Sequence, residues 1–424
     1  MNFFLDKLFL RANNLNYISQ NLQNITNNTP IKKIFDVINS YSSTSELRYV
    51  GGCVRKIIKK EKFDDIDLAT NLKPKEVSEL LQKNKINYYE SGIEHGTITV
   101  VLNNHKYEIT SLRKDISTDG RHAKVEFSND WKEDALRRDF SINSIYADRE
   151  GNLFDPLNGK KDLENGDVNF IGDPETRIKE DYLRILRYVR FFLNYSNKSH
   201  KPEIIKIIKR NIEGVSKLST ERLLGEFQKL SQSNGFLKLF KDKYCFELIR
   251  IIFPQFKNFD FFFKLNSYTM KKIYEIDFVF LLSLMIIDGS DNFDYFLYKF
   301  NISKKNQKRL KIIDNFYKKK VNINSFSEKN LNQFFYFNGK QAVIDIINFK
   351  IFKSRKFEKN LLRLLNIYQD KTIPTMPIGT NILMSKYNIP EGKLLGSKLK
   401  LIEKAWVKNN FQISDRQIKS IIGN

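Results

Sequence analysis

The pattern of secondary-structure signals changes once along this chain of 424 residues, near Gly172. Before that point, short apolar runs typical of strands alternate with stretches in which apolar residues recur at helical spacing. After it the strand signals fade, and the sequence as far as about Asp370 is mostly helical in pattern and rich in Phe, Ile, Leu and Lys. Because the chain is too long for one ordinary hydrophobic core, this change predicts two or more domains of different architecture.

The front part of the chain predicts a small α/β domain with a mixed sheet. We expect helices over residues 31–41, 54–60 and 75–83, and strands over 47–50, 66–69, 97–102 and 106–112. Asn103-Asn104 joins the last two strands and is a hairpin signal. Farther on, Asp173-Pro174 indicates a helix N-cap followed by proline at the first helical position, so one amphipathic helix is expected after Pro174. Lys371–Gly379 holds two of the nine prolines and is a candidate linker.

Charge is distributed unevenly along the chain. Residues 1–150 contain 23 basic and 21 acidic residues, whereas the remainder contains 49 and 28, within a net charge of +23. A codon bias toward Lys would enrich lysine everywhere, but it does not account for this asymmetry. The back part is therefore predicted to bind a polyanion, with nucleic acid as the leading candidate.

Two cysteines and the absence of a long apolar run exclude several other classes. Cys53 and Cys245 are too few for a disulfide framework or a four-thiolate zinc site, which favours a reducing, cytoplasmic setting. No apolar run approaches the ~18 residues of a membrane span, so no membrane partner is expected.

The stretch Tyr49–Thr70 reads YVGGCVRKIIKKEKFDDIDLAT and contains two carboxylates at i and i+2. Along a strand such residues point to one face, so Asp65 and Asp67 would lie together, which is unfavourable unless a cation sits between them. A few carboxylates plus substrate phosphates are the usual ligands of Mg²⁺, and two such ions can activate a hydroxyl and stabilise a leaving pyrophosphate. Glu108, on a neighbouring strand, is the candidate third ligand. The alternative is a strand end with solvated acids.

A glycine turn precedes the acid pair. Gly51-Gly52 ends a strand, where backbone N–H groups can approach a phosphate closely. Arg55, one turn farther on, can reach the same triphosphate. The glycine pair, the arginine and the Asp-x-Asp in this order favour a nucleotide site over solvated acids.

These features together resemble a polymerase-β-type nucleotidyltransferase of the class II tRNA nucleotidyltransferase and poly(A) polymerase family. DALRRDFSINSIY is similar to the family's sugar-recognition motif, ETRIKEDYLRILRYVRF to its nucleobase-reading helix and ERLLGEFQKL to the next helix of its neck. TSLRKDISTDGRHAKVEF is similar to the flexible loop of CCA-adding members, and a weaker likeness returns at IPEGKLLGSKLKLIEKAW. Lys56 stands where the family usually has an acidic residue, and Ser141 where it has threonine.

The resemblance implies an α+β fold with a polymerase-β-like head. We expect an N-terminal extension over 1–30, a catalytic head with a small mixed sheet over 31–170, a helical neck over 171–235, and an all-helical body and tail over 236–424 that bind tRNA. The implied catalytic and metal-binding residues are Asp65, Asp67 and Glu108. The implied nucleotide-binding residues are Gly51, Gly52, Arg55, Arg138, Asp139, Asn143, Asp181, Arg184, Arg187 and Arg190. Within that set, Asp139 can accept a hydrogen bond from a ribose 2′-OH, and Asn143 can both donate to the sugar and accept from it.

Asp181 and Arg184 are the implied base-reading pair. A helical wheel at 100° per residue makes them neighbours on one charged face, although a solvated face with ion pairs at i+3 and i+4 has the same pattern. A carboxylate accepts from an exocyclic amine, and arginine donates to an unprotonated ring nitrogen. Cytosine and adenine present both groups, whereas uracil and guanine present the opposite ones. Such a pair would select C and A without a nucleic-acid template.

The expected function is that of a CCA-adding tRNA nucleotidyltransferase. It would transfer CMP twice and then AMP from CTP and ATP to the 3′ end of tRNA, with Mg²⁺ as cofactor and pyrophosphate as product. The alternatives are a poly(A) polymerase, an enzyme restricted to CC or A addition, and a non-catalytic RNA-binding protein on the same fold. The intact acidic and basic motif residues argue against the non-catalytic alternative.

Overall fold

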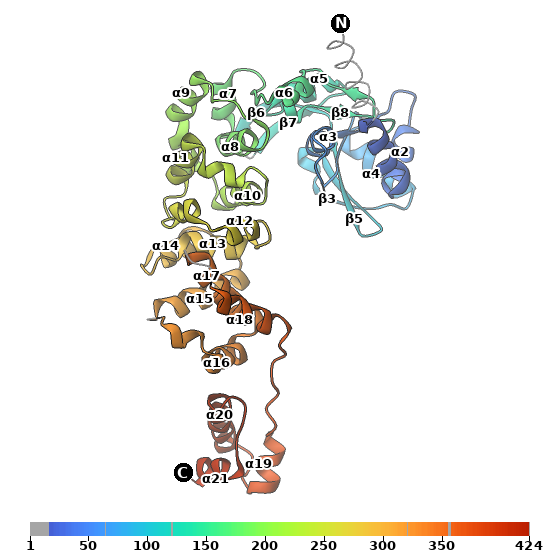
Figure 1. The fold of residues 1–424 in the computed structure, drawn as a ribbon. Coiled ribbons are helices and arrows are strands. Elements are labelled where there is room, and N and C mark those ends of the chain that lie inside the picture. The colour runs from blue at the N-terminus through green and yellow to red at the C-terminus, as the bar shows by residue number, and fades with distance from the viewer. Residues whose placement is uncertain (1–16, 64, 120–121, 320, 355–357, 424) are drawn as a thin grey trace. The chain divides into compact units, whose positions relative to one another are not determined.

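The computed structural model describes residues 17–63, 65–119, 122–319, 321–354 and 358–423. They belong to two compact units, Met1–Leu239 and Phe240–Asn424 (Figure 1). The first unit contains the strands and several helices, and every regular element described in the second is a helix. The predicted α+β class, with a mixed-sheet head followed by a largely helical part, is confirmed.

The head is built on a seven-stranded sheet with the strand order β3-β4-β5-β2-β1-β8-β9. Strands β2 and β5 are parallel and the other neighbours are antiparallel, so the sheet is mixed as predicted. Asn103 and Asn104, between β4 and β5, have φ of 48° and 65°. Two successive left-handed residues are what a tight hairpin turn needs, and the hairpin prediction is confirmed. The strands are β1 Leu47–Val50, β2 Asp67–Thr70, β3 Asn87–Gly92, β4 Thr97–Leu102, β5 His105–Ser111, β8 Tyr146–Ala147 and β9 Leu153–Phe154.

Helices α2 (Ile31–Asn39), α3 (Gly52–Ile58) and α4 (Pro74–Lys83) pack with this sheet. Residues 17–28 are also helical, and Ile18 and Leu22 are buried in the same core. The head's core therefore begins before residue 31. Apolar packing on the central strands β1 and β2 fixes the strand ends from which the glycine turn and Asp67 project.

A separate two-stranded sheet follows β5. It pairs β6 (Arg113–Asp119) with β7 (His122–Phe127) and has a bulge between Asp115 and Ser117. The sequence interpretation had identified this segment only as a flexible loop. Helix α5 (Trp131–Arg137), the short turn η2 (Ser141–Asn143) and α6 (Gly159–Asn165) then complete the head.

The prediction of a single helix after Pro174 is wrong. The structure has two helices, α7 (Pro174–Glu180) and α8 (Leu183–Tyr195), with Asp181 extended between them at φ −154° and ψ 105°. The reason is local, because Oδ1 of Asp181 accepts a hydrogen bond from the Leu183 backbone N–H at 3.1 Å and starts a new helix instead of continuing the first. The remaining neck elements are α9 Pro202–Asn211, η3 Ile212–Lys217 and α10 Thr220–Ser231.

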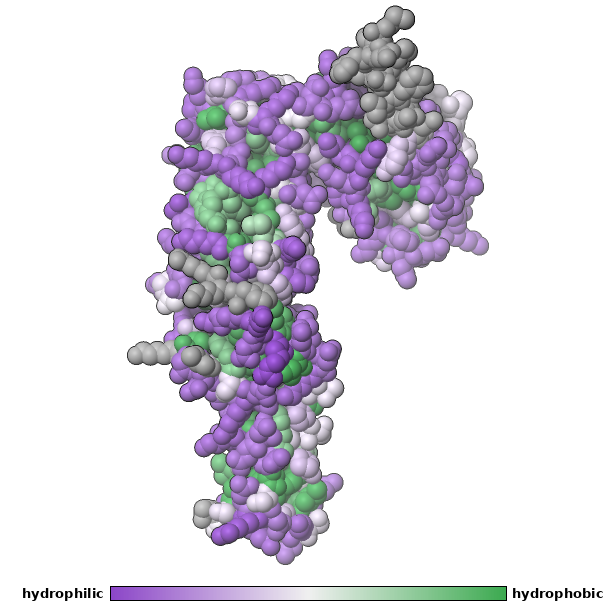
Figure 2. All heavy atoms as spheres, viewed as in Figure 1, coloured by the Kyte–Doolittle hydropathy of each residue, from purple (hydrophilic) through white to green (hydrophobic). Residues whose placement is uncertain are grey.

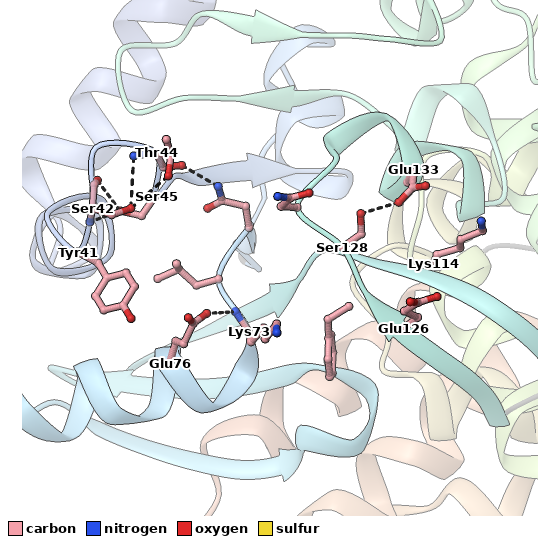
Figure 3. Close-up of a pocket in the computed structure, with 14 residues that line it drawn as sticks. Tyr41, Ser42, Thr44, Ser45, Lys73, Glu76, Lys114, Glu126, Ser128 and Glu133 are labelled. Atoms are coloured by element: carbon pink, nitrogen blue, oxygen red, sulfur yellow. Dashed lines mark hydrogen bonds between the residues drawn. The ribbon is translucent and has the colours of Figure 1, made fainter.

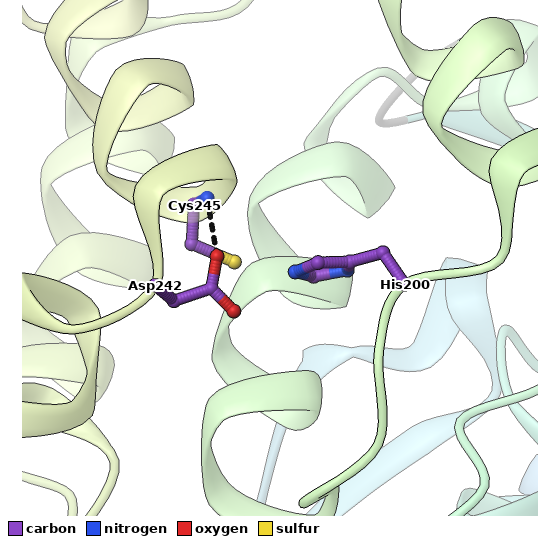
Figure 4. A group of neighbouring side chains, drawn as sticks. All are labelled: His200, Asp242 and Cys245. Atoms are coloured by element: carbon purple, nitrogen blue, oxygen red, sulfur yellow. Dashed lines mark hydrogen bonds between the residues drawn. The ribbon is translucent and has the colours of Figure 1, made fainter.

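The second unit is a series of helices on an aromatic-rich core. Its first helix, α11, begins where Asp242 accepts a hydrogen bond from the Cys245 backbone N–H at 2.9 Å (Figure 4). Residues 371–379 carry no helix or strand, as their prolines predicted. The elements are α11 Lys243–Ile252, η5 Phe259–Lys264, α12 Ser267–Lys272, α13 Phe278–Ile286, α14 Asn292–Lys299, α15 Lys304–Lys318, η6 Ile323–Phe326, α16 Glu328–Asn338, α17 Lys340–Lys353, α18 Lys359–Asp370, α19 Thr380–Tyr387, α20 Lys393–Lys408 and α21 Asp415–Gly423. The turn η4, Phe236–Phe240, precedes them.

Hydrophilic side chains cover most of the visible face of each unit (Figure 2). Among the residues that the structure describes, no helix is both long and apolar enough to cross a bilayer. The two cysteines are buried thiols, with Cys53 1% exposed in the first unit and Cys245 0% exposed in the second.

Candidate active site

A cavity of about 1100 Å³ opens in the first unit between the head and the neck helices. Side chains from α3, β2, the segment after α5, α8 and α10 line it. The sequence-predicted residues that line it are Gly51, Gly52, Arg55, Asp65, Asp67, Arg138, Asp139, Asn143, Asp181, Arg184, Arg187 and Arg190. Residues separated by more than a hundred positions are thus brought to one cavity.

The acid end of this cavity is formed by the Asp-x-Asp pair. Asp67 is the first residue of β2, and its register partner on the parallel strand β5 is Glu108, so the strand alignment inferred from sequence is correct. Asp65 lies two residues before the strand and is exposed, as is Glu108. Among the described residues, none donates a hydrogen bond to these three carboxylates. A cluster of hard oxygen ligands without protein partners fits a divalent cation.

Electrostatics at the acid end agree with the geometry. Burial raises the pKa of Asp67 above its ordinary value, Arg138 opposes that rise and the neighbouring Asp65 adds to it. Burial also raises the pKa of Glu108, and the charges of Asp67 and Asp65 raise it further. The three carboxylates therefore repel one another, and a cation between them would relieve that repulsion.

The glycine turn lies beside the acids. Gly51 has φ +66° and ψ −112°, a conformation that L side chains rarely adopt, and a Cβ there would lie 3.6 Å from Nη1 of Arg138. A Cβ on Gly52 would lie 3.9 Å from Oδ2 of Asp67. The bare backbone of this turn thus adjoins both an arginine and an acid of the cavity.

The sugar-motif residues form a connected network. Nδ2 of Asn143 donates to Oδ1 of Asp139 at 2.8 Å, and Nε of Arg187 donates to Oδ2 of Asp139 at 2.6 Å. Burial alone would raise the pKa of Asp139, but Arg187 and the Asn143 amide hold it well below its ordinary range. Arg55 donates to Oδ1 of Asn143, and its guanidinium is buried against the rings of Phe191 and Tyr195. Arg55 therefore forms part of the cavity wall.

Arg138 is held by a partner that sequence reasoning missed. Its Nη2 lies 2.9 Å from Oδ2 of Asp134, whose side chain is 1% exposed, and Tyr146 donates to the same oxygen at 2.6 Å. Burial opposes ionisation of Asp134, but Arg138 and Arg137 lower its pKa below the ordinary range. The i, i+4 spacing of Asp134 and Arg138 in DALRRD is the signal that could have revealed this pair.

The base end of the cavity differs from the helical-wheel prediction. Asp181 and Arg184 both line the cavity, but Asp181 lies in the break before α8. Nη1 of Arg184 donates to Oε2 of Glu180 and to the Arg177 carbonyl, both at 2.6 Å. Oδ2 of Asp181 accepts from Nη2 of Arg222 at 2.7 Å. The two residues are thus positioned by separate partners.

One face of α10 supplies contacts that sequence reasoning did not assign. Arg222, Glu226 and Lys229 recur at i, i+4 and i+7, a helical period readable in ERLLGEFQKL. Glu226 is 3% exposed and accepts from Nε of Arg190. Lys229 lines the cavity and lowers the pKa of both Asp67 and Glu108, against the rise caused by burial. This helix therefore borders both the base end and the acid end.

A second cavity, of about 590 Å³, lies on the head where β2 ends (Figure 3). It is lined by polar side chains, among them Lys73, Glu76 and Lys114, and by the Ser128 hydroxyl, which donates to Glu133 at 2.5 Å. Its lining shares no residue with the first cavity.

Comparisons with known proteins show which sequences this chain is similar to. A family model described as the poly A polymerase head domain matches residues 47–169. Human CCA tRNA nucleotidyltransferase 1, mitochondrial, is 45% identical over 192 residues, which are 45% of this chain and 44% of that protein. The aligned stretch thus spans less than half of that relative. A CCA-adding enzyme of Streptococcus uberis is 29% identical over 392 residues, covering 89% of this chain and 92% of that protein.

Solved structures share the fold along most of the chain. A Bacillus stearothermophilus CCA-adding enzyme in complex with CTP superposes with a TM-score of 0.67 at 19% identity, covering 93% of this chain and 97% of that one. A Thermotoga maritima CCA-adding enzyme complexed with tRNA superposes with a TM-score of 0.57 at 17% identity, covering 93% and 96%.

Proposed function

Since the chain belongs to the class II tRNA nucleotidyltransferase and poly(A) polymerase family, we propose that it is a CCA-adding tRNA nucleotidyltransferase. It would transfer CMP twice and then AMP from CTP and ATP to the 3′ end of tRNA and release pyrophosphate. One observation carries the proposal: a single cavity joins Asp65 and Asp67, which are suited to a cation, with a carboxylate–arginine pair suited to the edges of C and A. Glu108, the register partner of Asp67 on β5, lies beside that acid pair but outside the cavity lining.

Enzymes of this family use divalent metal ions, and we propose Mg²⁺ for this chain. Asp65, Asp67 and Glu108 would hold it, since they are hard oxygen ligands without protein donors. When bound, such ions activate an attacking hydroxyl and stabilise a leaving pyrophosphate. The backbone of Gly51 and Gly52 would then adjoin the triphosphate.

The other residues of the cavity would orient the nucleotide. Asp139, kept ionised by Arg187, would accept from the ribose 2′-OH, and Asn143 would contact the same sugar. Asp181 would accept from the exocyclic amine of C or A, and Arg184 would donate to the ring nitrogen. Three other arginines would chiefly contribute positive charge to the cavity wall, because protein partners hold their guanidinium groups. These pairs are Arg55 with Asn143, Arg138 with Asp134, and Arg190 with Glu226.

tRNA is the proposed acceptor, and the relatives named for CCA addition support it. The basic helical part after residue 170 would bind its phosphates by charge and shape rather than by sequence. A reducing, cytoplasmic setting is proposed from the two buried thiols, although the human relative is named mitochondrial. Fractionation of cells expressing a tagged chain would separate the two compartments.

The test uses purified chain, tRNA lacking its last three nucleotides, Mg²⁺ and labelled nucleotides, supplied singly and together. Incorporation of C, then A, that stops after three additions is expected. A long A tail would identify a poly(A) polymerase, the activity in the name of the matching head-domain family. Addition of C alone or A alone would identify a restricted enzyme, and no incorporation with retained tRNA binding would identify a non-catalytic RNA-binding protein.

A further inference from the structure

Arg222 contacts Asp181 of the proposed base-reading pair and has no role in the function described so far. It lies on α10, lines the cavity and donates from Nη2 to Oδ2 of Asp181 at 2.7 Å. The two side chains are 21% and 18% exposed, so the ion pair is largely shielded from water. Such a pair fixes geometry more firmly than an exposed one.

Asp181 needs an external anchor because no helix fixes it. The residue lies between α7 and α8 with extended backbone, and only two contacts hold its carboxylate among the described residues. The Leu183 backbone N–H donates to Oδ1 and Arg222 donates to Oδ2. Each carboxylate oxygen carries two lone pairs, so each can still accept from an exocyclic amine. Arg222 can therefore hold the carboxylate without consuming its capacity to read a base.

Arg184 is anchored by partners of its own on α7. Nη1 gives both of its protons to protein acceptors, Oε2 of Glu180 and the Arg177 carbonyl. The protons on Nε and Nη2 point along the other edge of the planar guanidinium and remain for a ring nitrogen. Arg184 is thus tied to the protein through Nη1, and Asp181 accepts one protein donor at each of its oxygens.

We propose that Arg222 is a specificity-determining positioning residue that holds the Asp181 carboxylate in the orientation that accepts from the amine of C or A. This rests on the proposed function. The same helix face holds Arg190 through Glu226, so α10 fixes the wall against which the base is read. The opposite possibility is a latch, in which Arg222 occupies Asp181 until a nucleotide displaces it. The two differ in sign, because loss of a latch improves CTP use and loss of a positioning residue impairs it.

The experiment measures kcat and KM for single CTP and UTP additions to tRNA lacking its last three nucleotides. For Arg222→Ala, the ratio of kcat/KM for CTP over UTP should fall about fivefold to tenfold, with most of the loss in KM for CTP. Arg222→Lys should restore at least half of the ratio on a logarithmic scale, because a lysine keeps the charge and one donor. Arg222→Gln should resemble Arg222→Ala.

Arg210→Ala is the matched control. Arg210 also pairs with an acid of the neck, Glu175 at 3.1 Å, but it is 64% exposed and does not line the cavity. Its ratio should equal that of the unaltered chain, and melting curves should confirm folding for every variant. If Arg222→Ala does not fold, the ratio of kcat/KM for CTP over UTP is compared between Arg222→Lys and Arg222→Gln. Equal ratios in those two variants overturn the proposal.

An unchanged or higher CTP preference in a folded Arg222→Ala overturns the proposal. If Asp181→Ala lowers the ratio in the same assay, the proposed function survives and only the role of Arg222 is lost. If the unaltered chain incorporates no nucleotide, the proposed function fails, and the inference fails with it.

Discussion

The two ends of the cavity use the same side-chain chemistry in opposite ways. At the acid end, the carboxylates of Asp65 and Asp67 have no donors among the described residues, and neither has Glu108, which lies beside them on β5. The pKa values of Asp67 and Glu108 are raised. At the sugar and base end, Asp139 and Asp181 are each paired with an arginine, and the pKa of Asp139 is lowered. A carboxylate left unpaired is available to a cation, whereas a paired one is a fixed acceptor.

The largest effect on activity is expected when an acid is removed from the unpaired end. Asp65→Ala and Asp67→Ala should each lower nucleotide addition about a thousandfold or more, because the divalent ion would lose a ligand worth several kcal/mol of transition-state stabilisation. Single-turnover addition to tRNA measures this, and filter binding should show unchanged tRNA affinity. Glu108→Ala should lose less. Near-normal turnover in either aspartate variant would remove the metal assignment.

Asp139→Asn tests the paired end through stability. The folded pKa of Asp139 is depressed, so its ionised form stabilises the fold above the unfolded pKa of about 3.9, and that contribution is lost as pH falls through the folded value. Urea unfolding should show a loss of about 2 kcal/mol at pH 7, modest because the Arg187 side chain keeps 29% exposure. The difference between variant and unaltered chain should shrink below pH 4.

Asp167→Asn is the control for that measurement. Asp167 pairs with Lys198 at 2.6 Å, but the lysine is 52% exposed, so its loss should cost less than about 1 kcal/mol. An Asp139→Asn difference that does not depend on pH would mean that shape, not charge, accounts for the loss.

Substitutions of the base-reading residues at the paired end should change the choice of nucleotide more than the rate of nucleotide addition. Asp181→Ala removes the acceptor for the amine, so preference for CTP over UTP should fall about tenfold or more. Arg184→Ala should relax the choice as well and lower the overall rate, with residual addition still dependent on the divalent ion. Measured kcat/KM values for all four nucleotides decide. Equal losses for all four would mean that these residues only stabilise the neck.

A smaller effect should follow from disturbing the break that presents Asp181. A Cβ on Gly214 would lie 2.1 Å from Cε1 of Tyr182, so Gly214→Ala must push the ring that adjoins Asp181. We expect KM for CTP to rise about threefold, as small misplacements cost modest factors. Gly225→Ala is the matched control, since no heavy atom other than its chain neighbours and the backbone of its own helix lies within 4 Å of its Cβ position, and alanine favours the helix interior. Equal KM values in the two variants would separate Tyr182 from base binding.

Local signals in the sequence predicted the head well. Strands β1 and β4 begin and end where the apolar pattern predicted, and the Asn103-Asn104 turn is a local signal that needs no tertiary contact. The hairpin of β6 and β7 was not predicted as strands because RKDISTD has few apolar residues, so period-2 alternation is weak there. The break at Asp181 was missed because a side-chain hydrogen bond to the backbone competes with helix continuation, which periodicity does not detect.

In the cavity, too, residues with a local sequence signal were predicted and residues that depend on tertiary contacts were not. Residues within short motifs, such as Asp67 and Asn143, could be selected from sequence, and the structure brings them to one cavity. Sequence reasoning could not select Arg222 and Glu226. Their partners, Asp181 and Arg190, lie 41 and 36 residues away in the chain, and the packing of α8 against α10 brings them together. Which acids stay unpaired is likewise a property of the fold.

Each compact unit contains one cysteine, and both thiols are buried, at 1% exposure for Cys53 and 0% for Cys245. Alkylating reagents attack an exposed thiolate, and burial raises the pKa of Cys53 to about 11. Modification of Cys53 therefore waits for the β1–α3 region to open, and modification of Cys245 waits for α11. The labelling rate of Cys53 therefore measures transient opening of the head-and-neck unit, and that of Cys245 measures opening of the helical unit. If tRNA or a nucleotide lowers one rate and not the other, the slowed cysteine identifies the unit that the ligand stabilises.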